Sequence, residues 1–249
     1  MARLYLIRHA QSANNAIWDG RGDDQPGRVP DPEVTDIGHR QCEALAEHLV
    51  HPQAEPRQHP YLSDNVAHFG LTHVYCSLMT RSILTAEYIA GACGLPLQAL
   101  PDVFEKYGIY DVDANGNLQG LPGPGRDYFS ERFPRLALPA DFNDAGWWSR
   151  PVEDEAAFLV RMQGVVADMH ARMAGNDDVV ALVAHGDFID QFLNELMGVV
   201  RHQPNYDNHW VANWTFHNTS ISRIDFVDGA HHVVYTNRID HLPNELVTW

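Results

Sequence analysis

The pattern of apolar and polar positions predicts a sheet of buried strands. Residues 3–7 and 179–184 form short, nearly continuous apolar runs, which are typical of strands that are covered on both faces. Weaker apolar runs at 74–76 and 97–100 predict two further strands. We therefore expect these four segments to form the buried part of one sheet.

Apolar residues recur at helical spacing between these runs. We expect helices at residues 80–93, 155–173 and 188–197, and a further helix that begins after Thr35. The side chain of Thr35 can cap this further helix, whose apolar face would carry Ile37, Leu45 and Leu49. Gly94 can end the helix at 80–93.

The C-terminal part of the chain predicts a hairpin. Residues 220–226 and 232–236 flank Asp228-Gly229, a pair that favours a tight turn between two strands. Strands that alternate with helices and end in a hairpin predict an α/β fold, a three-layer α/β/α sandwich with a mainly parallel sheet. We expect one domain that spans residues 1–249.

Two long stretches, residues 14–31 and 111–150, show neither pattern. Long loops in a compact domain are usually functional, so we expect both at the mouth of a site, the second within an insertion or lid at about 107–152. The insertion is rich in aromatic residues and contains Arg126, Arg132 and Arg135. These side chains either receive a bulky ester with a second anionic group or pack the insertion onto the domain; we prefer packing.

The charge balance limits the possible partners. The 249 residues include 33 acidic and 17 basic residues, which give a formal net charge of −16. Such a chain repels nucleic acid and anionic membranes, so we expect neither as a partner. It binds a phosphorylated molecule only if its few arginines are concentrated at one site.

Other features of the composition predict a cytoplasmic protein. No apolar run is long enough to cross a bilayer, and the first residues lack the apolar stretch of a secretory signal. Cys42, Cys76 and Cys93 are scattered and form no CxxC pair, so we expect reduced, buried thiols. Nothing in the sequence indicates an oligomeric state.

Basic side chains follow three of the predicted strands. Arg8 and His9 follow the first strand, Arg81 lies just beyond the strand at 74–76, and His185-Gly186 follows the strand at 179–184. Ligands of open α/β sheets bind beyond the carboxyl ends of the strands, and the N–H groups from Gly186 onward would open a helix that favours anions. Taken singly, each residue also fits a surface histidine, an ordinary turn or an exposed helix arginine.

A carboxyl group is expected at the same edge of the sheet. Glu105 follows the strand at 97–100 among apolar neighbours, which would raise its pKa and suit a general acid. A surface ion pair with Lys106 is the competing interpretation. The remaining histidines, such as His48 and His51, form no convincing set of metal ligands, so we expect no metal site.

The order of these motifs resembles the histidine phosphatase superfamily, also called phosphoglycerate mutase-like. Residues 8–15 resemble its Arg-His-Gly-Glu-Ser-x-x-Asn motif, with Ala10 and Gln11 in place of glycine and glutamate. Further segments resemble its Leu-Thr-x-x-Gly-x-x-Gln motif, its Ser-x-x-x-Arg-x-x-x-Thr-Ala helix and its second histidine motif, at residues 34–41, 77–86 and 185–186. The resemblance extends from residue 3 to about 225 and is weak across 111–150.

The resemblance implies roles for the site residues. His9 would attack phosphorus and form a phosphohistidine, a choice over His185 that the residues alone do not make. The implied catalytic residues are Arg8, His9, Arg81, Glu105 and His185, and the phosphate would be bound by Arg8, Asn15, Arg81, His185 and Gly186. Glu105 would protonate the leaving alkoxide and then assist water. No metal or other cofactor is implied.

Three functions remain open at this point. A metal-independent phosphatase acting on a small phosphorylated molecule, with inorganic phosphate as product, is preferred. A mutase is the first alternative, although the segments Glu-Arg-x-Tyr-Gly and Arg-Arg-Ser of cofactor-dependent phosphoglycerate mutases are not found here. A non-catalytic phosphate-binding protein on the same fold is the second. The sequence does not indicate the substrate.

Overall fold

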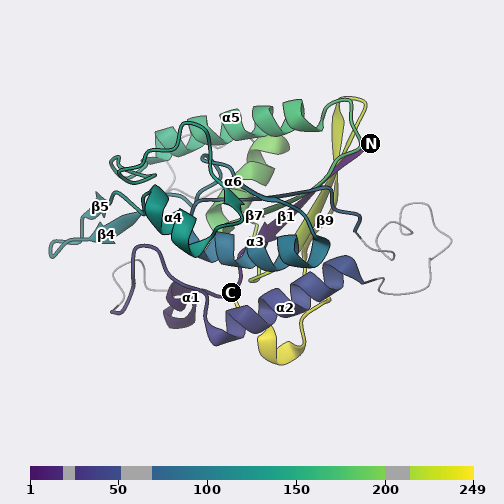
Figure 1. Cartoon of the computed structure of the whole chain (residues 1–249). Coiled ribbons are helices and arrows are strands. Elements are labelled where there is room, and N and C mark those ends of the chain that lie inside the picture. The colour runs from purple at the N-terminus through teal and green to yellow at the C-terminus, as the bar shows by residue number, and fades with distance from the viewer. Residues whose placement is uncertain (19–25, 52–68, 200–213) are drawn as a thin grey trace.

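A seven-stranded sheet forms the centre of the molecule (Figure 1). The computed structural model describes residues 1–18, 26–51, 69–199 and 214–249. The strand order is β6-β3-β2-β7-β1-β8-β9, with bounds Leu136–Ala137, Leu97–Ala99, His73–Cys76, Val179–Ala184, Ala2–Arg8, Ile221–Val227 and Ala230–Arg238. Neighbours from β6 to β1 are parallel, whereas β8 is antiparallel to β1 and β9 to β8. The prediction of a mainly parallel sheet is confirmed.

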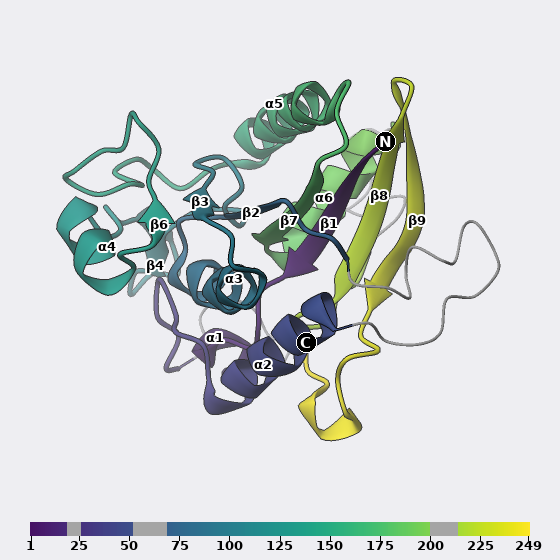
Figure 2. The ribbon, with the colours of Figure 1, turned by 45° about the vertical axis from the view of Figure 1, so that its right-hand side comes forward.

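Helices cover both faces of this sheet, as expected for a three-layer sandwich (Figures 1 and 2). The helices are α2 (Asp36–Val50) and α3 (Thr80–Cys93) on one face, and α5 (Glu155–Met173) and α6 (Gly186–Leu196) on the other. Alternate side chains of β1 pack against the helices on the two faces of the sheet, because successive residues of a strand point to opposite faces. Tyr5 and Ile7 lie in one core with α2 and α3, whereas Leu4 and Leu6 lie in the other with α5 and α6.

Local sequence signals account for several element ends. The Thr35 hydroxyl accepts a hydrogen bond from Gly38 N at 3.1 Å and caps α2. Gly94 ends α3 with a φ of 66°. The hairpin turn uses Asp228 and Gly229 at φ 50° and 80°, the left-handed conformation that this pair favours.

The predicted apolar face of α2 is wrong at Ile37, which is 37% exposed. Gly38 takes the buried position instead. It lies seven residues before Leu45, which is close to two helical turns, so both residues face the sheet.

The insertion at 107–152 lies at the edge of the sheet opposite the β8–β9 hairpin (Figure 2). It contains the small sheet of β4 (Tyr110–Val112) and β5 (Leu118–Gly120), the helix α4 (Arg126–Arg132) and the edge strand β6. Phe129, Trp147 and Trp148 are buried in the same core as α3. These aromatic side chains thus pack the insertion onto the sheet, as preferred from the sequence.

Two short helices complete the described elements, α1 (Ala13–Ile17) and the 3₁₀ helix Asn244–Leu246. All three cysteines are free thiols; Cys42 and Cys76 are buried, whereas Cys93 at the end of α3 is only half-buried. Among the described residues, the helices are all too short or too polar to cross a bilayer.

Candidate active site

The strand ends bring the two predicted histidines together. β1 and β7 are parallel neighbours with Arg8 opposite Ala184, so the residues that follow them, His9 and His185, emerge side by side. Their ring centroids are 5.2 Å apart and both side chains are buried. The prediction that these residues meet at one edge of the sheet is confirmed by this geometry.

The hydrogen bonds of His9 define its tautomer. Nδ1 lies 2.8 Å from the carbonyl oxygen of Ala10, and because a carbonyl only accepts, Nδ1 carries the hydrogen. Nε2 therefore has a lone pair, which accepts a hydrogen bond from Arg81 Nε at 3.1 Å. Burial, and then the charges of Arg81 and Arg8, lower the pKa of His9 well below 6.5. His9 thus presents a neutral, nucleophilic nitrogen to the site.

His185 is held differently. Its Nε2 lies 2.7 Å from Ser77 Oγ, and Ser77 Oγ also accepts a hydrogen bond from Met79 N at 3.2 Å. A hydroxyl can donate one hydrogen bond and accept two, so this contact is compatible with either tautomer of His185, whose Nδ1 is a buried atom with no partner among the described residues. Burial, and then Arg81 and His9, lower the pKa of His185 well below 6.5. His185 is therefore a neutral imidazole.

The half-buried Arg8 and the buried Arg81 supply positive charge beside these rings. Arg8 donates from Nη1 to Phe216 O at 2.5 Å, and burial lowers its pKa to about 10. Burial also lowers the pKa of Arg81, whose Nη1 lies 3.9 Å from Asp31. Asp31 accepts hydrogen bonds from Thr80 N at 3.0 Å and Thr80 Oγ1 at 2.7 Å, so it caps α3 from outside the helix. Sequence reasoning missed Asp31, which lies in the stretch that showed no pattern.

Glu105 lies at the N-terminus of α6. Its carboxylate accepts hydrogen bonds from Phe188 N at 3.0 Å, Asp187 N at 3.3 Å and Lys106 N at 3.0 Å. Burial, and then the charge of Asp187, raise the pKa of Glu105 to about 7 although Arg81 opposes the shift. Lys106 forms its ion pair with Glu155 at 2.6 Å, which disagrees with the alternative of a Glu105–Lys106 surface pair.

This placement changes the expectation for Gly186. The first N–H groups of α6 were expected to receive phosphate, but those of Asp187 and Phe188 bond to Glu105. Gly186 itself lies beside the side chains of Arg8 and Glu105. A Cβ added to Gly186 would be 3.6 Å from Arg8 Nε and 3.9 Å from Glu105 Oε2. These are ordinary van der Waals distances, so Arg8 and Glu105 lie beside the start of the helix without a steric need for glycine there.

Asn15 lies in α1 with its amide fixed in orientation. Its Oδ1 accepts hydrogen bonds from Ser12 N at 3.1 Å, Ser12 Oγ at 3.0 Å and Asn218 Nδ2 at 3.2 Å. With the oxygen engaged in this way, the Nδ2 group is the donor available to a ligand. The residue lines the same cavity as His9, as the sequence predicts.

Helix α2 supports the loop that follows His9. Gln41 Oε1 accepts from Gln11 N at 2.8 Å, and Thr35 N donates to Gln11 O at 2.9 Å. Gly38 lies so close that an added Cβ would be 2.3 Å from Gln11 O. The two departures from the family motif fit here, because Ala10 is fully buried and the Gln11 side chain accepts from Thr35 Oγ1 at 2.7 Å.

A cavity of about 150 Å³ lies beside several of these side chains, but His185 and Gly186 are not among the residues that line it. Its lining includes Arg8, His9, Asn15, Arg81 and Glu105. Within the described residues, no group of three or more His, Cys, Asp or Glu side chains is arranged to hold a metal ion.

The arginine that reaches this cavity from a loop is Arg28, not an arginine of the insertion. Arg126 pairs with Asp144 and Arg132 with Glu33, both at 2.5 Å on the surface. Arg28 lines the cavity instead, with its guanidinium 4.0 Å above the ring of Tyr110.

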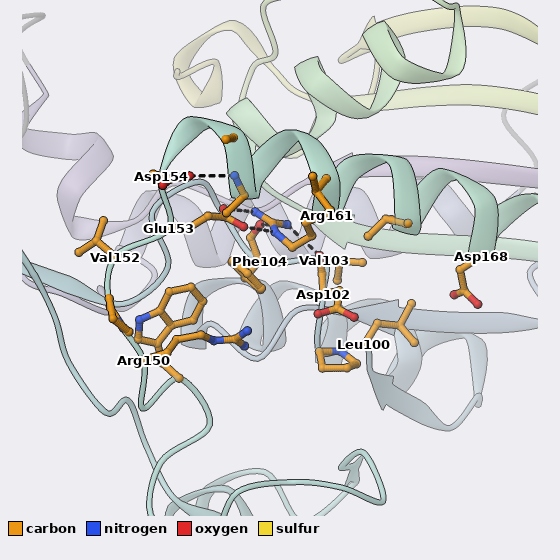
Figure 3. A pocket seen from close by; sticks show the side chains of 18 of the residues that line it. Leu100, Asp102, Val103, Phe104, Arg150, Val152, Glu153, Asp154, Arg161 and Asp168 are labelled. Atoms are coloured by element: carbon orange, nitrogen blue, oxygen red, sulfur yellow. Dashed lines mark hydrogen bonds and ion pairs between the residues drawn. The ribbon is translucent and has the colours of Figure 1, made fainter.

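A larger cavity lies elsewhere in the described part of the chain. It measures about 1090 Å³ and is bordered by α5 and the segments around Phe104 and Arg150 (Figure 3). Neither His9 nor His185 lines it. The small cavity at the strand ends, rather than this larger one, therefore holds the predicted chemistry.

Comparison with known proteins agrees with this arrangement. The family model described as histidine phosphatase superfamily (branch 1) matches residues 54–239, about three quarters of the chain. The matched range includes Arg81, Glu105 and His185. A probable phosphoglycerate mutase GpmB of Yersinia pestis (strain Pestoides F) is 24% identical over 226 residues, which cover 91% of this chain and 86% of the relative.

Solved structures share the fold. A phosphoserine phosphatase mutant from Entamoeba histolytica, in complex with phosphoserine, aligns with a TM-score of 0.55 and 17% identity over 98% of this chain and 100% of the other. A mycobacterial glucosyl-3-phosphoglycerate phosphatase, in a complex with inorganic phosphate, aligns with a TM-score of 0.55 and 19% identity over 98% and 100% of the two chains. At these identities the likeness establishes the fold alone.

Proposed function

This chain belongs to the histidine phosphatase superfamily (branch 1), and from that premise we propose that it is a metal-independent phosphoric monoester hydrolase with His9 as nucleophile. One observation carries the proposal. The Nε2 lone pair of a neutral His9 lies in one cavity with two arginines and a carboxyl group whose pKa is raised to about 7. A nucleophile, positive charge and a proton donor are the three groups that hydrolysis through a covalent intermediate requires.

In the first step, His9 Nε2 attacks phosphorus and the bond from phosphorus to the ester oxygen breaks. Glu105, protonated near neutral pH, gives its proton to the leaving oxygen, so that an alcohol departs. Arg8 and Arg81 balance the charge on the phosphoryl oxygens, with Asn15 and His185 as neutral donors. The hydrogen bond from His9 Nδ1 to Ala10 O stays in place while the ring becomes positive.

In the second step, water attacks phosphorus of the phosphohistidine. The Glu105 carboxylate formed in the first step accepts a proton from this water, and the bond between Nε2 and phosphorus breaks. The electron pair returns to Nε2, inorganic phosphate leaves and Glu105 is again protonated. The sum is one ester and one water converted to one alcohol and one phosphate.

Removal of the nucleophile tests this proposal. We expect His9→Ala to lower kcat on phosphate monoesters by on the order of 10³-fold or more, because the covalent route is lost. Rapid acid or base quenching with radiolabelled substrate is expected to trap phosphohistidine in the unchanged enzyme and not in His9→Ala. His51→Ala, at an exposed histidine, is the matched control. Label on His185, or near-normal turnover in His9→Ala, contradicts the assignment.

Mutase activity is the second candidate, favoured by the similarity to a probable phosphoglycerate mutase of Yersinia pestis. The two activities differ in what the phosphohistidine meets, since a mutase returns the phosphoryl group to substrate and a phosphatase passes it to water. Labelled phosphoenzyme mixed with 3-phosphoglycerate separates them. Release of inorganic phosphate at an unchanged rate supports hydrolysis, whereas label in a bisphosphate or an isomeric monoester supports the mutase.

A small phosphorylated molecule is the substrate class that we infer. The size of the cavity, about 150 Å³, supports a phosphoryl group with a limited part of its leaving group. The solved neighbours named above are a phosphoserine phosphatase in complex with phosphoserine and a glucosyl-3-phosphoglycerate phosphatase in complex with phosphate. A panel of metabolite phosphates, nucleotides and phosphotyrosine identifies the preferred ester. The three free thiols support a reducing, cytoplasmic location.

A further inference from the structure

The proposed general acid lies on a segment without regular secondary structure. β3 ends at Ala99 and β4 begins at Tyr110, so Glu105 is placed between them by a chain with no helix or strand. A proton donor must lie within about 2.6–3.2 Å of the oxygen that it protonates. Contacts from residues outside this segment must therefore fix the backbone next to Glu105.

Arg161 of α5 makes such contacts with the segment before Glu105. Its Nη1 donates to the carbonyl oxygens of Asp102 at 2.8 Å and Phe104 at 3.0 Å. Its guanidinium carbon lies 3.7 Å above the ring of Phe104 (Figure 3). Arg161 thus holds both the backbone and the side chain of the residue directly before Glu105.

Glu153 fixes the plane of this guanidinium. Arg161 Nε and Nη2 donate to the two oxygens of Glu153, both at 2.7 Å, in a bidentate pair (Figure 3). The two side chains are only 8% and 7% exposed, so water does not compete for these bonds. A lysine or an apolar side chain in place of Arg161 provides no such planar fork.

The other side of Phe104 is also held. The ring of Trp148 packs edge-on against it with centroids 4.7 Å apart, and the guanidinium of Arg150 lies 4.4 Å above Trp148. Phe104 is therefore fixed between α5 and the insertion, and Glu105 next to it reaches the N-terminus of α6.

We propose that Arg161, oriented by Glu153, is the positioning residue of the general acid Glu105. The inference rests on the proposed function, because it assigns Arg161 a part in the same reaction without contact to substrate. It also gives a role to residues that line the cavity of about 1090 Å³, which His9 does not line. The competing explanation is a buried ion pair that contributes to folding alone.

The leaving group of the substrate distinguishes these explanations. An alkyl ester such as glycerol 3-phosphate needs its leaving oxygen protonated, whereas 4-nitrophenyl phosphate does not. We expect Arg161→Met to lower kcat/KM for the alkyl ester by about tenfold to a hundredfold relative to the aryl ester, because a displaced acid donates poorly. The ratio of the two values is independent of the folded fraction, so loss of stability does not imitate the effect.

The matched control is Arg172→Met. Arg172 lies on the same helix and lines the same cavity, but it pairs with Asp168 on the surface. We expect its ratio to equal that of the unchanged enzyme. Arg161→Lys is expected to recover part of the ratio through one donor, and Glu153→Gln to fall between the unchanged enzyme and Arg161→Met.

The outcomes separate the two proposals. An unchanged ratio in Arg161→Met overturns the positioning role and leaves the phosphatase standing. If the unchanged enzyme hydrolyses neither these two esters nor any ester of the metabolite panel, the proposed function fails, and the Glu105 carboxyl signal in carbon NMR tests the positioning alone. We then expect its pKa to fall from about 7 in Arg161→Met, as water enters, and not in Arg172→Met. Equal titration in both variants overturns the inference.

Discussion

His9 and His185 are both buried beside two arginines, and the partner of one ring nitrogen in each distinguishes them. A carbonyl acceptor at Nδ1 leaves His9 with a lone pair on Nε2, whereas Ser77 occupies Nε2 of His185. Motif spacing does not contain this information, because it depends on which atom each ring presents to its neighbours. The pKa values of both lie well below 6.5, so both rings are neutral in the physiological range.

The pH dependence of turnover follows from the single residues. Glu105 donates a proton only below its pKa of about 7, whereas His9 is already unprotonated at pH 6.5. We expect kcat/KM for an alkyl ester to fall about tenfold per pH unit well above pH 7, where Glu105 is largely ionised. The measurement is a pH–rate profile on glycerol 3-phosphate.

Glu105→Gln is the control for this profile. Its amide does not titrate, so we expect a lower rate with no fall above pH 7. A fall that persists unchanged in Glu105→Gln assigns the titration to another group and removes the carboxyl from the role of general acid.

At the scale of elements, α2 acts as a support for the loop after β1. The motif Thr35-x-x-Gly38-x-x-Gln41 places a cap, a close approach and an amide acceptor on one side of the helix, and all three contact Gln11. Because Gln11 is two residues from His9, a displacement of α2 would also displace the proposed nucleophile. The family motif thus has a physical explanation in this chain.

The substitution Gly38→Ala tests whether α2 supports the loop after β1. The added Cβ would lie 2.3 Å from the Gln11 carbonyl oxygen, so helix and loop must separate. We expect a loss of about 1–3 kcal/mol in the free energy of unfolding, measured with urea, together with a lower kcat.

Gly164→Ala in α5 is the control for Gly38→Ala. Nothing lies within 4 Å of the Cβ that it adds, and we expect it to stabilise the helix by up to about 1 kcal/mol. Equal effects of the two substitutions, or normal activity in a destabilised Gly38→Ala, contradict the proposed support.

The periodicity of apolar residues predicted the strands and helices whose sequence signals lie within the element itself. The strands at 3–7 and 179–184 and the helices at 80–93 and 155–173 follow from burial and periodicity, and their observed bounds agree closely. Ile37 failed because an apolar residue in the first turn does not by itself indicate which side of the helix meets the sheet.

The sequence predicted the meeting of site residues, but not their supports. Strand ends in a parallel sheet meet at one edge, which is why Arg8, His9 and His185 were found. Asp31 acts on Thr80 across 49 positions of chain, through a cap, and Arg161 acts on Phe104 across 57 positions, through a backbone carbonyl. Such contacts have no period or spacing, so only the folded structure reveals them. For the same reason, the sequence did not indicate that Glu105 would occupy the start of α6.

At the scale of the whole molecule, the net charge of −16 opposes the approach of a phosphate dianion, while the buried arginines attract it at short range. Changing the salt concentration separates the long-range repulsion from the short-range attraction. The Debye length falls from about 30 Å at 0.01 M to about 8 Å at 0.15 M, so added salt screens the distant acidic surface far more than the groups inside the cavity.

We therefore expect kcat/KM for a dianionic ester to rise by roughly twofold to fivefold between 0.01 and 0.15 M KCl. The value of kcat at saturating substrate is the internal control and is expected to stay constant, because repulsion acts on association and not on the bound ester. Potassium chloride is preferable to sulfate, since sulfate would compete for the arginines. A steep fall of kcat/KM with salt would mean that the field at the mouth of the cavity is attractive at long range. The surface around the cavity, with Arg28 and Lys106 at its lining, would then outweigh the acidic remainder of the molecule.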